Sequence, residues 1–181
     1  MSIENDIGRA EIIERICREA SKLPKKEAEL FCKFVHAFYR RIFIDDFKER
    51  SIIDLYGAAL SEWQLLKKRN GSPESIRVYN PQFEQHGWQS SKTIVEAVHE
   101  NIPFLVDSLR AELNERGYFC HLMLYVSDVQ LVKDKSGEIV DILIDDKIDA
   151  SKPSNTVIYV EINRQVEEGV CEQIESQLKA V

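Results

Sequence analysis

Hydrophobic residues in the first seventy positions recur at intervals of three and four, the spacing that predicts amphipathic helices. A first helix is predicted by the stripe Ile12, Ile13, Ile16 and Ala20. A second, with Pro24 in its first turn, is predicted by Leu30, Phe31, Phe34, Val35, Phe38 and Ile42. A third follows the capping pattern Ser51-x-x-Asp54, and its apolar face is formed by Ile52, Leu55, Tyr56, Ala59, Leu60, Trp63 and Leu66. Residues 1–70 are therefore expected to form a helical N-terminal subdomain.

The pattern changes after NGSPES, residues 70–75, whose turn-forming residues mark a boundary. Beyond it, SIRVYNP (75–81) and KTIVEAV (92–98) are predicted to be strands, the first of them ended by Pro81. A helix follows, with one apolar face formed by Ile102, Leu105, Val106, Leu109 and Leu113. Gly117 is predicted to end this helix. The continuous apolar run YFCHLMLYV, residues 118–126, predicts a strand that is buried on both faces.

The remaining pattern predicts a hairpin at residues 130–144 with its tip near Ser136-Gly137, a strand at 156–162 and a last helix carrying Val170, Ile174 and Leu178. The C-terminal half of the chain thus reads strand, helix, strand, strand, strand, helix. This order predicts an α+β domain with helices on one face of a mainly antiparallel sheet. A βαββαβ unit has one more strand after its second helix. Either the strand near Val78 supplies that sheet edge, or the chain is part of a longer polypeptide.

Composition narrows the function classes. A formal net charge of −7 over 181 residues argues against general nucleic-acid binding, which needs clustered Lys and Arg. The opening MSIENDIGRA lacks the apolar segment of a signal peptide, and no apolar run approaches the roughly 20 residues of a membrane span. We therefore expect a cytoplasmic protein. Buried free thiols, and no metal site, are expected from the wide scatter of Cys17, Cys32, Cys120 and Cys171.

Motifs that would indicate catalysis are missing from the sequence. The seven glycines never cluster, so there is neither a dinucleotide-binding fingerprint nor a P-loop. Metal-ligand spacing is also missing among His36, His86, His99 and His121. The pairs Asp45-Asp46 and Asp145-Asp146 are expected to be solvated residues at the ends of elements. The loop HGWQSS, residues 86–91, is unusual, and a structural plug is favoured there over a binding role.

The candidate ligand-binding residues are Asn101, Ile102, Pro103 and Phe104, which join a predicted strand to a predicted helix. The first turn of a helix presents free backbone N–H groups, a natural place for a carboxylate or another anion. In the simpler interpretation, Asn101 only caps the helix. Both interpretations stay open.

Several of these segments resemble the N-terminal region of the large bacterial NAD-specific glutamate dehydrogenases. The resemblance rests on DLYGAALSEW (residues 54–63), on the long run from Arg77 to Gly117 that contains IPFLVDS, and on VEINRQ (160–165). It implies a soluble cytoplasmic enzyme that deaminates L-glutamate to 2-oxoglutarate with NAD. It also implies a very long polypeptide with its catalytic domain far downstream, so that no cofactor is expected in this chain.

The same resemblance implies an ACT-like domain, a βαββαβ module that binds amino acids or pairs sheets edge to edge. The usual ACT loop carries Asp-x-Pro-Gly before a Leu-rich helix, and Asn101-Ile102-Pro103-Phe104 occupies that place. Phe104 replaces the glycine that lets a ligand approach the backbone. We therefore expect a non-catalytic module for oligomerisation or allosteric regulation, with homo-oligomeric contacts at strand edges. The alternative is an amino-acid-sensing domain.

Overall fold

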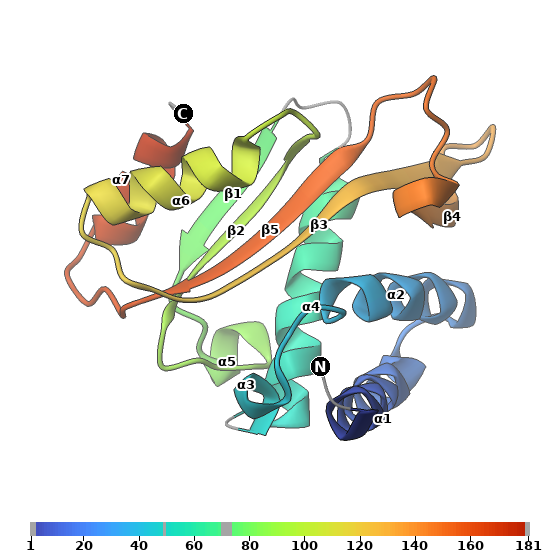
Figure 1. Cartoon of the computed structure of the whole chain (residues 1–181), viewed down its shortest axis with the longest axis horizontal. Coiled ribbons are helices and arrows are strands. Elements are labelled where there is room, and N and C mark those ends of the chain that lie inside the picture. Colours follow the sequence, from blue (N-terminus) through green and yellow to red (C-terminus); the bar gives the residue numbers. More distant parts are fainter. Residues whose placement is uncertain (1–2, 49, 70–73, 180–181) are drawn as a thin grey trace.

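The computed structural model of the chain describes residues 3–48, 50–69 and 74–179 (Figure 1). Its N-terminal part is helical: α1 (Ile3–Glu19), the 3-10 turn η1 (Ala20–Lys22), α2 (Lys25–Phe38), α3 (Ile44–Lys48) and α4 (Ile52–Lys68). The three predicted helices are confirmed, and the short α3 is an addition. The predicted break at residues 70–75 falls largely on residues outside the described part.

The capping signal at α4 has the expected geometry. The Ser51 hydroxyl accepts a hydrogen bond from the Asp54 N–H at 3.1 Å and donates one to the Asp54 carboxylate at 2.7 Å. This satisfies one of the N–H groups that the first turn of a helix leaves without an intrahelical partner. The start of α4, which carries several residues of the site described below, is thereby fixed.

The rest of the chain forms an antiparallel sheet with the strand order β1-β2-β5-β3-β4. Its strands are β1 (Glu74–Tyr79), β2 (Thr93–Glu100), β3 (Cys120–Lys133), β4 (Ile139–Ile144) and β5 (Asn155–Ile162). The connections and the last element are α5 (Phe83–His86), α6 (Leu105–Glu115), η2 (Asp145–Lys147) and α7 (Val170–Leu178). This arrangement confirms the predicted α+β, ACT-like fold class.

The strand near Val78 supplies the sheet edge, as one of the two sequence-based alternatives proposed. β1 pairs with β2 so that Val78 lies opposite Val95. In a βαββαβ unit this edge belongs to the strand that follows the second helix. Here the segment between α4 and β2 fills the place.

β3 differs from the prediction in two ways. It runs from Cys120 to Lys133, so the predicted strand at 118–126 and the first arm of the predicted hairpin are one strand, with a register shift between Val126 and Val129. It is also not buried on both faces, since His121 is exposed. The strands buried on both faces are β2 and β5, which lie side by side between the two helical layers. Residues 120–126 of β3 pair only with β5, because β4 pairs with residues 129–133, so this part of β3 forms an edge of the sheet. The predicted hairpin tip is confirmed by Gly137, whose N–H donates to the Asp134 carbonyl at 3.0 Å.

Helices cover both faces of the sheet (Figure 1). α6 and α7 lie on one face, where the core includes Leu109, Leu113, Val160, Ile174 and Leu178. α2 and α4 lie on the other face, with α1 packed outside them, and that core includes Phe34, Phe38, Trp63, Leu124 and Tyr159. The predicted sandwich with helices on one face describes the ACT-like unit itself, and the N-terminal helices close the opposite face.

Candidate functional site

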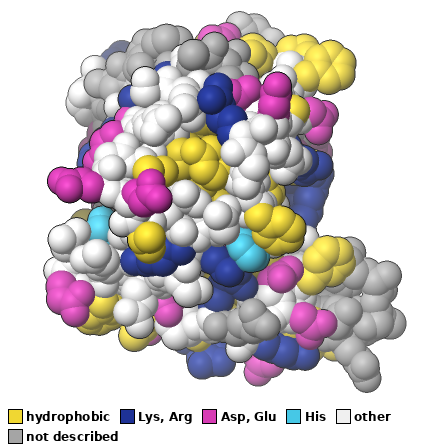
Figure 2. Space-filling view, turned by 90° about the vertical axis from the view of Figure 1, so that its left-hand side faces the viewer, with side chains coloured by type: hydrophobic (Ala, Val, Ile, Leu, Met, Phe, Trp, Pro, Cys, Tyr) yellow, Lys and Arg dark blue, Asp and Glu magenta, His cyan; other side chains and the backbone are white. Residues whose placement is uncertain are grey.

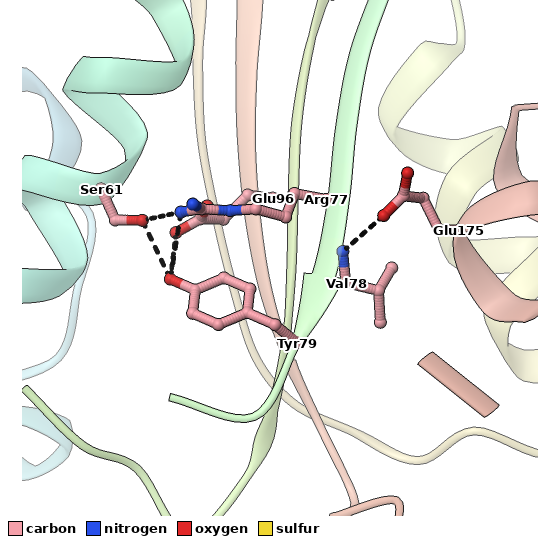
Figure 3. Close-up of polar contacts among 6 residues, drawn as sticks. All are labelled: Ser61, Arg77, Val78, Tyr79, Glu96 and Glu175. Atoms are coloured by element: carbon pink, nitrogen blue, oxygen red, sulfur yellow. Dashed lines mark hydrogen bonds and ion pairs between the residues drawn. The ribbon is translucent and has the colours of Figure 1, made fainter. Parts of the chain in front are cut away.

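Charged side chains are buried between α4 and the sheet (Figure 3). Glu96 of β2 is fully buried and lies opposite Arg77 of β1, which donates to its Oε2 from Nη2 at 2.5 Å and from Nε at 3.0 Å. The Tyr79 hydroxyl donates to the other carboxylate oxygen of Glu96 at 2.9 Å. Ser61 of α4 contacts both the Tyr79 hydroxyl, at 2.9 Å, and Arg77. The alternation of a strand turns Arg77 and Tyr79 toward the same face.

A second buried pair lies on the same face of the sheet. Glu161 of β5, only 3% exposed, accepts hydrogen bonds from Arg50 Nη2 at 2.5 Å and Nε at 3.3 Å. The Tyr159 hydroxyl donates to the same carboxylate at 3.1 Å. Arg50 also donates to the carbonyl of Asp46 in α3. The pair therefore links the segment between α3 and α4 to the central strand of the sheet.

The buried charges do not balance. Among the residues whose burial the structure describes, three carboxyl groups are buried, those of Glu62, Glu96 and Glu161. Arg77 pairs with Glu96 and Arg50 with Glu161, so Glu62 has no ion-pair partner there. Neither carboxyl oxygen of Glu62 has a hydrogen-bond partner among the described residues. Burial, and then the nearby charge of Glu96, raises the pKa of Glu62 well above its ordinary value. The direction of this shift favours the protonated form of Glu62 within the cluster.

Glu62 makes stability depend on pH. In the unfolded chain it ionises near 4.5, whereas the folded protein retains the proton to a higher pH. The free energy of unfolding is therefore expected to fall by up to ~1.4 kcal/mol per pH unit as pH rises above about 4.5, until the folded pKa is reached. The variant Glu62→Gln should lose this slope in urea unfolding series between about pH 5 and 8. The exposed Glu115→Gln is the control, and equal slopes in Glu62→Gln and the unaltered chain would contradict the assignment.

A cavity of about 590 Å³ opens beside the Arg50–Glu161 pair. Its walls come from the start of α4, the loop at residues 81–92, β3 and the end of β5. This volume lies within the range of small-molecule pockets. Figure 2 shows the end of the molecule that lies to the left in Figure 1, where Lys and Arg side chains form a band with histidine and exposed hydrophobic side chains around it.

The unusual loop HGWQSS forms part of this cavity. Trp88 is 3% exposed and packs directly against Gly57 of α4, as expected for a structural plug. The Gln89 N–H donates to the Asp54 carboxylate at 3.0 Å, which fixes the loop to the start of α4. Trp88, Gln89 and Ser90 also line the cavity. The loop therefore packs against α4 and also lines the cavity.

Comparison with known proteins identifies the family. The model described as "Glutamate dehydrogenase, ACT1 domain" matches residues 34–178. The chain belongs to this family. It is 35% identical over 164 residues to an NAD-specific glutamate dehydrogenase of Halomonas elongata, covering 91% of this chain and 10% of that protein. It is 36% identical over 148 residues to that of Pseudomonas aeruginosa, covering 82% of this chain and 9% of that protein.

The chain thus spans about a tenth of the length of these curated relatives. No solved structure matches it. The family resemblance seen in the sequence is confirmed, and three of the segments that carry it contribute residues to the two buried charged pairs and their neighbours. DLYGAALSEW contributes Ser61 and Glu62, the run from Arg77 to Gly117 contributes Arg77, Tyr79 and Glu96, and VEINRQ contributes Glu161. None of these residues was singled out as functional from the sequence.

In this ACT1-family chain, Asn101 does not cap α6. Its side-chain amide donates to the Asp128 carboxylate at 2.7 Å, and its oxygen accepts from the Thr156 hydroxyl at 2.9 Å. The cap position belongs to Phe104, whose backbone is left-handed with φ 64° and whose side chain makes no cap hydrogen bond. The capping prediction is therefore wrong, because Asn101 instead ties the end of β2 to β3 and β5.

The four predicted ligand-binding residues lie away from the cavity. Lys92, on the cavity wall, directly precedes β2, whereas Asn101 directly follows it, so the two regions lie at opposite ends of this strand. Ile102 is 46% exposed and Phe104 is 78% exposed. A ligand-binding role for Asn101, Ile102, Pro103 and Phe104 stays a prediction.

The remaining candidate groups have structural surroundings. Within the described residues no three His, Cys, Asp or Glu side chains are grouped to hold a metal ion, and no helix there is long and apolar enough to cross a membrane. The four cysteines are free but half-buried, not fully buried as expected, because each lies near the rim of its core. Of the acidic pairs, Asp45 forms an exposed ion pair with Lys48, and Asp145 forms one with Arg40.

Proposed function

We propose that the chain is a non-catalytic module of an NAD-dependent glutamate dehydrogenase that serves its assembly or allosteric control. The parent enzyme converts L-glutamate to 2-oxoglutarate and ammonia in the cytoplasm, with the catalytic residues and the NAD site elsewhere in a longer chain. The observation that carries the proposal is the match to the glutamate dehydrogenase ACT1 family over residues 34–178, in a chain about a tenth as long as its NAD-specific relatives.

The buried cluster supports a role in control. The proposal divides the chain into a helical subdomain at residues 1–70 and an ACT-like domain at 76–181. Ser61 and Glu62 of the first part lie against Arg77, Tyr79 and Glu96 of the second, and the two parts share one hydrophobic core. A displacement of α4 therefore disturbs the sheet directly. Such a junction is suited to passing a signal between the rest of the parent chain and the sheet.

The surface around Phe104 supports a role in assembly. Two outward N–H groups of the edge strands already donate to carboxylates, that of Val78 to Glu175 at 3.4 Å (Figure 3) and that of Ile142 to Asp141 at 2.8 Å. These contacts disfavour extension of the sheet. Phe104, in contrast, is 78% exposed in a strained left-handed backbone. We place the contact with a second copy of the chain at Ile102 and Phe104.

The substitution Phe104→Gly tests this contact. Glycine adopts φ 64° without strain, so the variant is expected to be more stable by about 1 kcal/mol. Sedimentation velocity over rising protein concentration should show self-association of the unaltered chain and a monomer for Phe104→Gly. The matched control is Phe119→Ser, which removes another aromatic side chain that is 65% exposed. The assembly role would be contradicted if the unaltered chain stayed a monomer at high concentration, or if Phe104→Gly self-associated as strongly as the unaltered chain.

The alternative is an amino-acid sensor with its ligand at Asn101, Ile102, Pro103 and Phe104. One observation favours it: the first turn of α6 has no side-chain acceptor at its cap, so its N–H groups face outward for a carboxylate. Calorimetry with glutamate and aspartate on the unaltered chain distinguishes the two functions. Heat that saturates at millimolar amino acid, from a protein that stays monomeric, supports the sensor, and its absence rejects the sensor.

A further inference from the structure

Two thiols lie side by side in the helical layer. Cys17 of α1 and Cys32 of α2 are in hydrogen-bond contact through their side chains, and the Cys32 Sγ also donates to the Cys17 carbonyl at 3.8 Å. The two helices pack against each other and are joined by η1 and residues 23–24. The pair of thiols therefore lies across the contact between α1 and α2.

Both thiols are accessible from solvent in the folded chain. Cys17 and Cys32 are half-buried at the rim of the core that the N-terminal helices share with the sheet. Cys120 and Cys171 are also half-buried, but they pack against the core on the opposite face of the sheet. These two cysteines therefore serve as controls, because they have a similar degree of burial and lie away from the pair.

The surroundings of Cys17 assign different roles to the two sulfurs. Burial, and then the contact with Cys32, raises the pKa of the Cys17 thiol. The thiolate is the nucleophile in thiol chemistry, so Cys17 is poorly suited to attack an oxidant first. Cys32 is therefore assigned as the attacking sulfur, and Cys17 as the neighbouring thiol that completes the reaction.

The oxidant that fits this pair is a small-molecule disulfide, such as glutathione disulfide. The Cys32 thiolate attacks one of its sulfurs, so that a mixed disulfide forms and one glutathione thiolate leaves. The Cys17 sulfur then attacks the Cys32 sulfur, and the second glutathione leaves with the proton of the Cys17 thiol. The two cysteines lose two electrons in total, and the glutathione disulfide is reduced to two thiols.

We propose that Cys17 and Cys32 form a redox-sensitive clamp, in which an intramolecular disulfide holds α1 against α2 under oxidising conditions. A disulfide bond is about 2.05 Å long, and sulfurs that are already in contact reach this distance by rotation of their side chains. The bond fixes α1, which also packs against α3 and α4. The clamp does not depend on the proposed function, since a monomeric chain outside any glutamate dehydrogenase would still form it.

Incubation of the folded chain with glutathione disulfide tests the clamp. Mass spectrometry of peptides prepared without reductant should find Cys17 linked to Cys32, and dithiothreitol should reverse the link. In the variant Cys17→Ser, Cys32 should instead retain the mixed disulfide with glutathione. The oxidised chain should unfold about 5–10 °C above the reduced chain, the shift expected when a short loop is closed in a chain of this size.

Control variants make each outcome decisive. The double variant Cys120→Ser, Cys171→Ser retains the pair and should form the disulfide and show the same shift, whereas Cys17→Ser and Cys32→Ser should each abolish the shift. Circular dichroism confirms that each variant is folded. The clamp is overturned if Cys17 and Cys32 end as separate mixed disulfides, if their link forms only in urea that unfolds the chain, or if the link leaves the unfolding midpoint unchanged.

Discussion

Replacing Arg50 with methionine is expected to lower the free energy of unfolding by about 3–5 kcal/mol. Glu161 is 3% exposed, and Arg50 is the only cation that bonds to it among the described residues. Methionine fills similar space but leaves the carboxylate buried with one hydrogen bond, from Tyr159. An uncompensated charge of this kind costs more than the intact pair contributes. Urea unfolding at neutral pH measures the loss.

Two further variants separate the buried charge from the loss of packing. The double variant Arg50→Met, Glu161→Gln removes both charges and should recover most of the stability, since the cost lies in the unpaired carboxylate. Arg40→Met breaks an exposed pair, with side chains 43% and 42% exposed, and should cost no more than about 1 kcal/mol. Equal losses in Arg50→Met and Arg40→Met would show that the Glu161 pair is not effectively buried.

Gly57→Ala is expected to destabilise the protein by about 3 kcal/mol, although alanine is the better helix former by about 1 kcal/mol. A Cβ atom at Gly57 would lie 2.3 Å from both Cβ and Cγ of Trp88. Because these atoms are close to the main chain, a side-chain rotation alone cannot relieve the clash, and the loop at residues 86–91 must move. The shift in Trp88 emission and the unfolding midpoint measure the two consequences.

Gly137→Ala provides the comparison. Gly137 has φ 86° and no atom within 4 Å of an added Cβ, so its substitution introduces backbone strain without a clash. It should cost about 1 kcal/mol and leave the emission of Trp88 unchanged. If Gly57→Ala is as stable as the unaltered chain, the loop is not packed against α4 in solution.

The sequence was sufficient for the elements whose pattern is local. The apolar stripes of α1, α2 and α4 and the cap at Ser51 needed only neighbouring residues, and they were predicted correctly. The continuity of β3 was not, because the pattern predicted one strand that ended at residue 126 and a hairpin that began at residue 130. Between these positions Asp128 adopts φ 56° at a register shift, and the strand continues. Burial of β3 was overestimated because an apolar run does not reveal a strand's place in the sheet.

The buried charged residues were not predicted, although the sequence contains an indication of them. Glu96 lies between the apolar residues Val95 and Ala97, Glu161 lies between Val160 and Ile162, and Arg77 is the single cation of β1. A charge in a buried strand requires a partner. The sequence does not show which strands are neighbours, so the pairs could not be assigned. The cavity could not be predicted either, because its walls come from segments more than a hundred residues apart and the sequence does not show that they are neighbours.

The position of β5 has a consequence for how the chain folds. β1 pairs with β2 and β3 with β4, and the members of each pair are close in sequence, whereas β5 comes last and lies between the two pairs. Two-stranded hairpins are marginally stable in water. We therefore expect that neither half of the sheet is stable until residues 155–162 join them. The sheet is expected to form late, when β5 pairs with both halves and closes both hydrophobic cores at once.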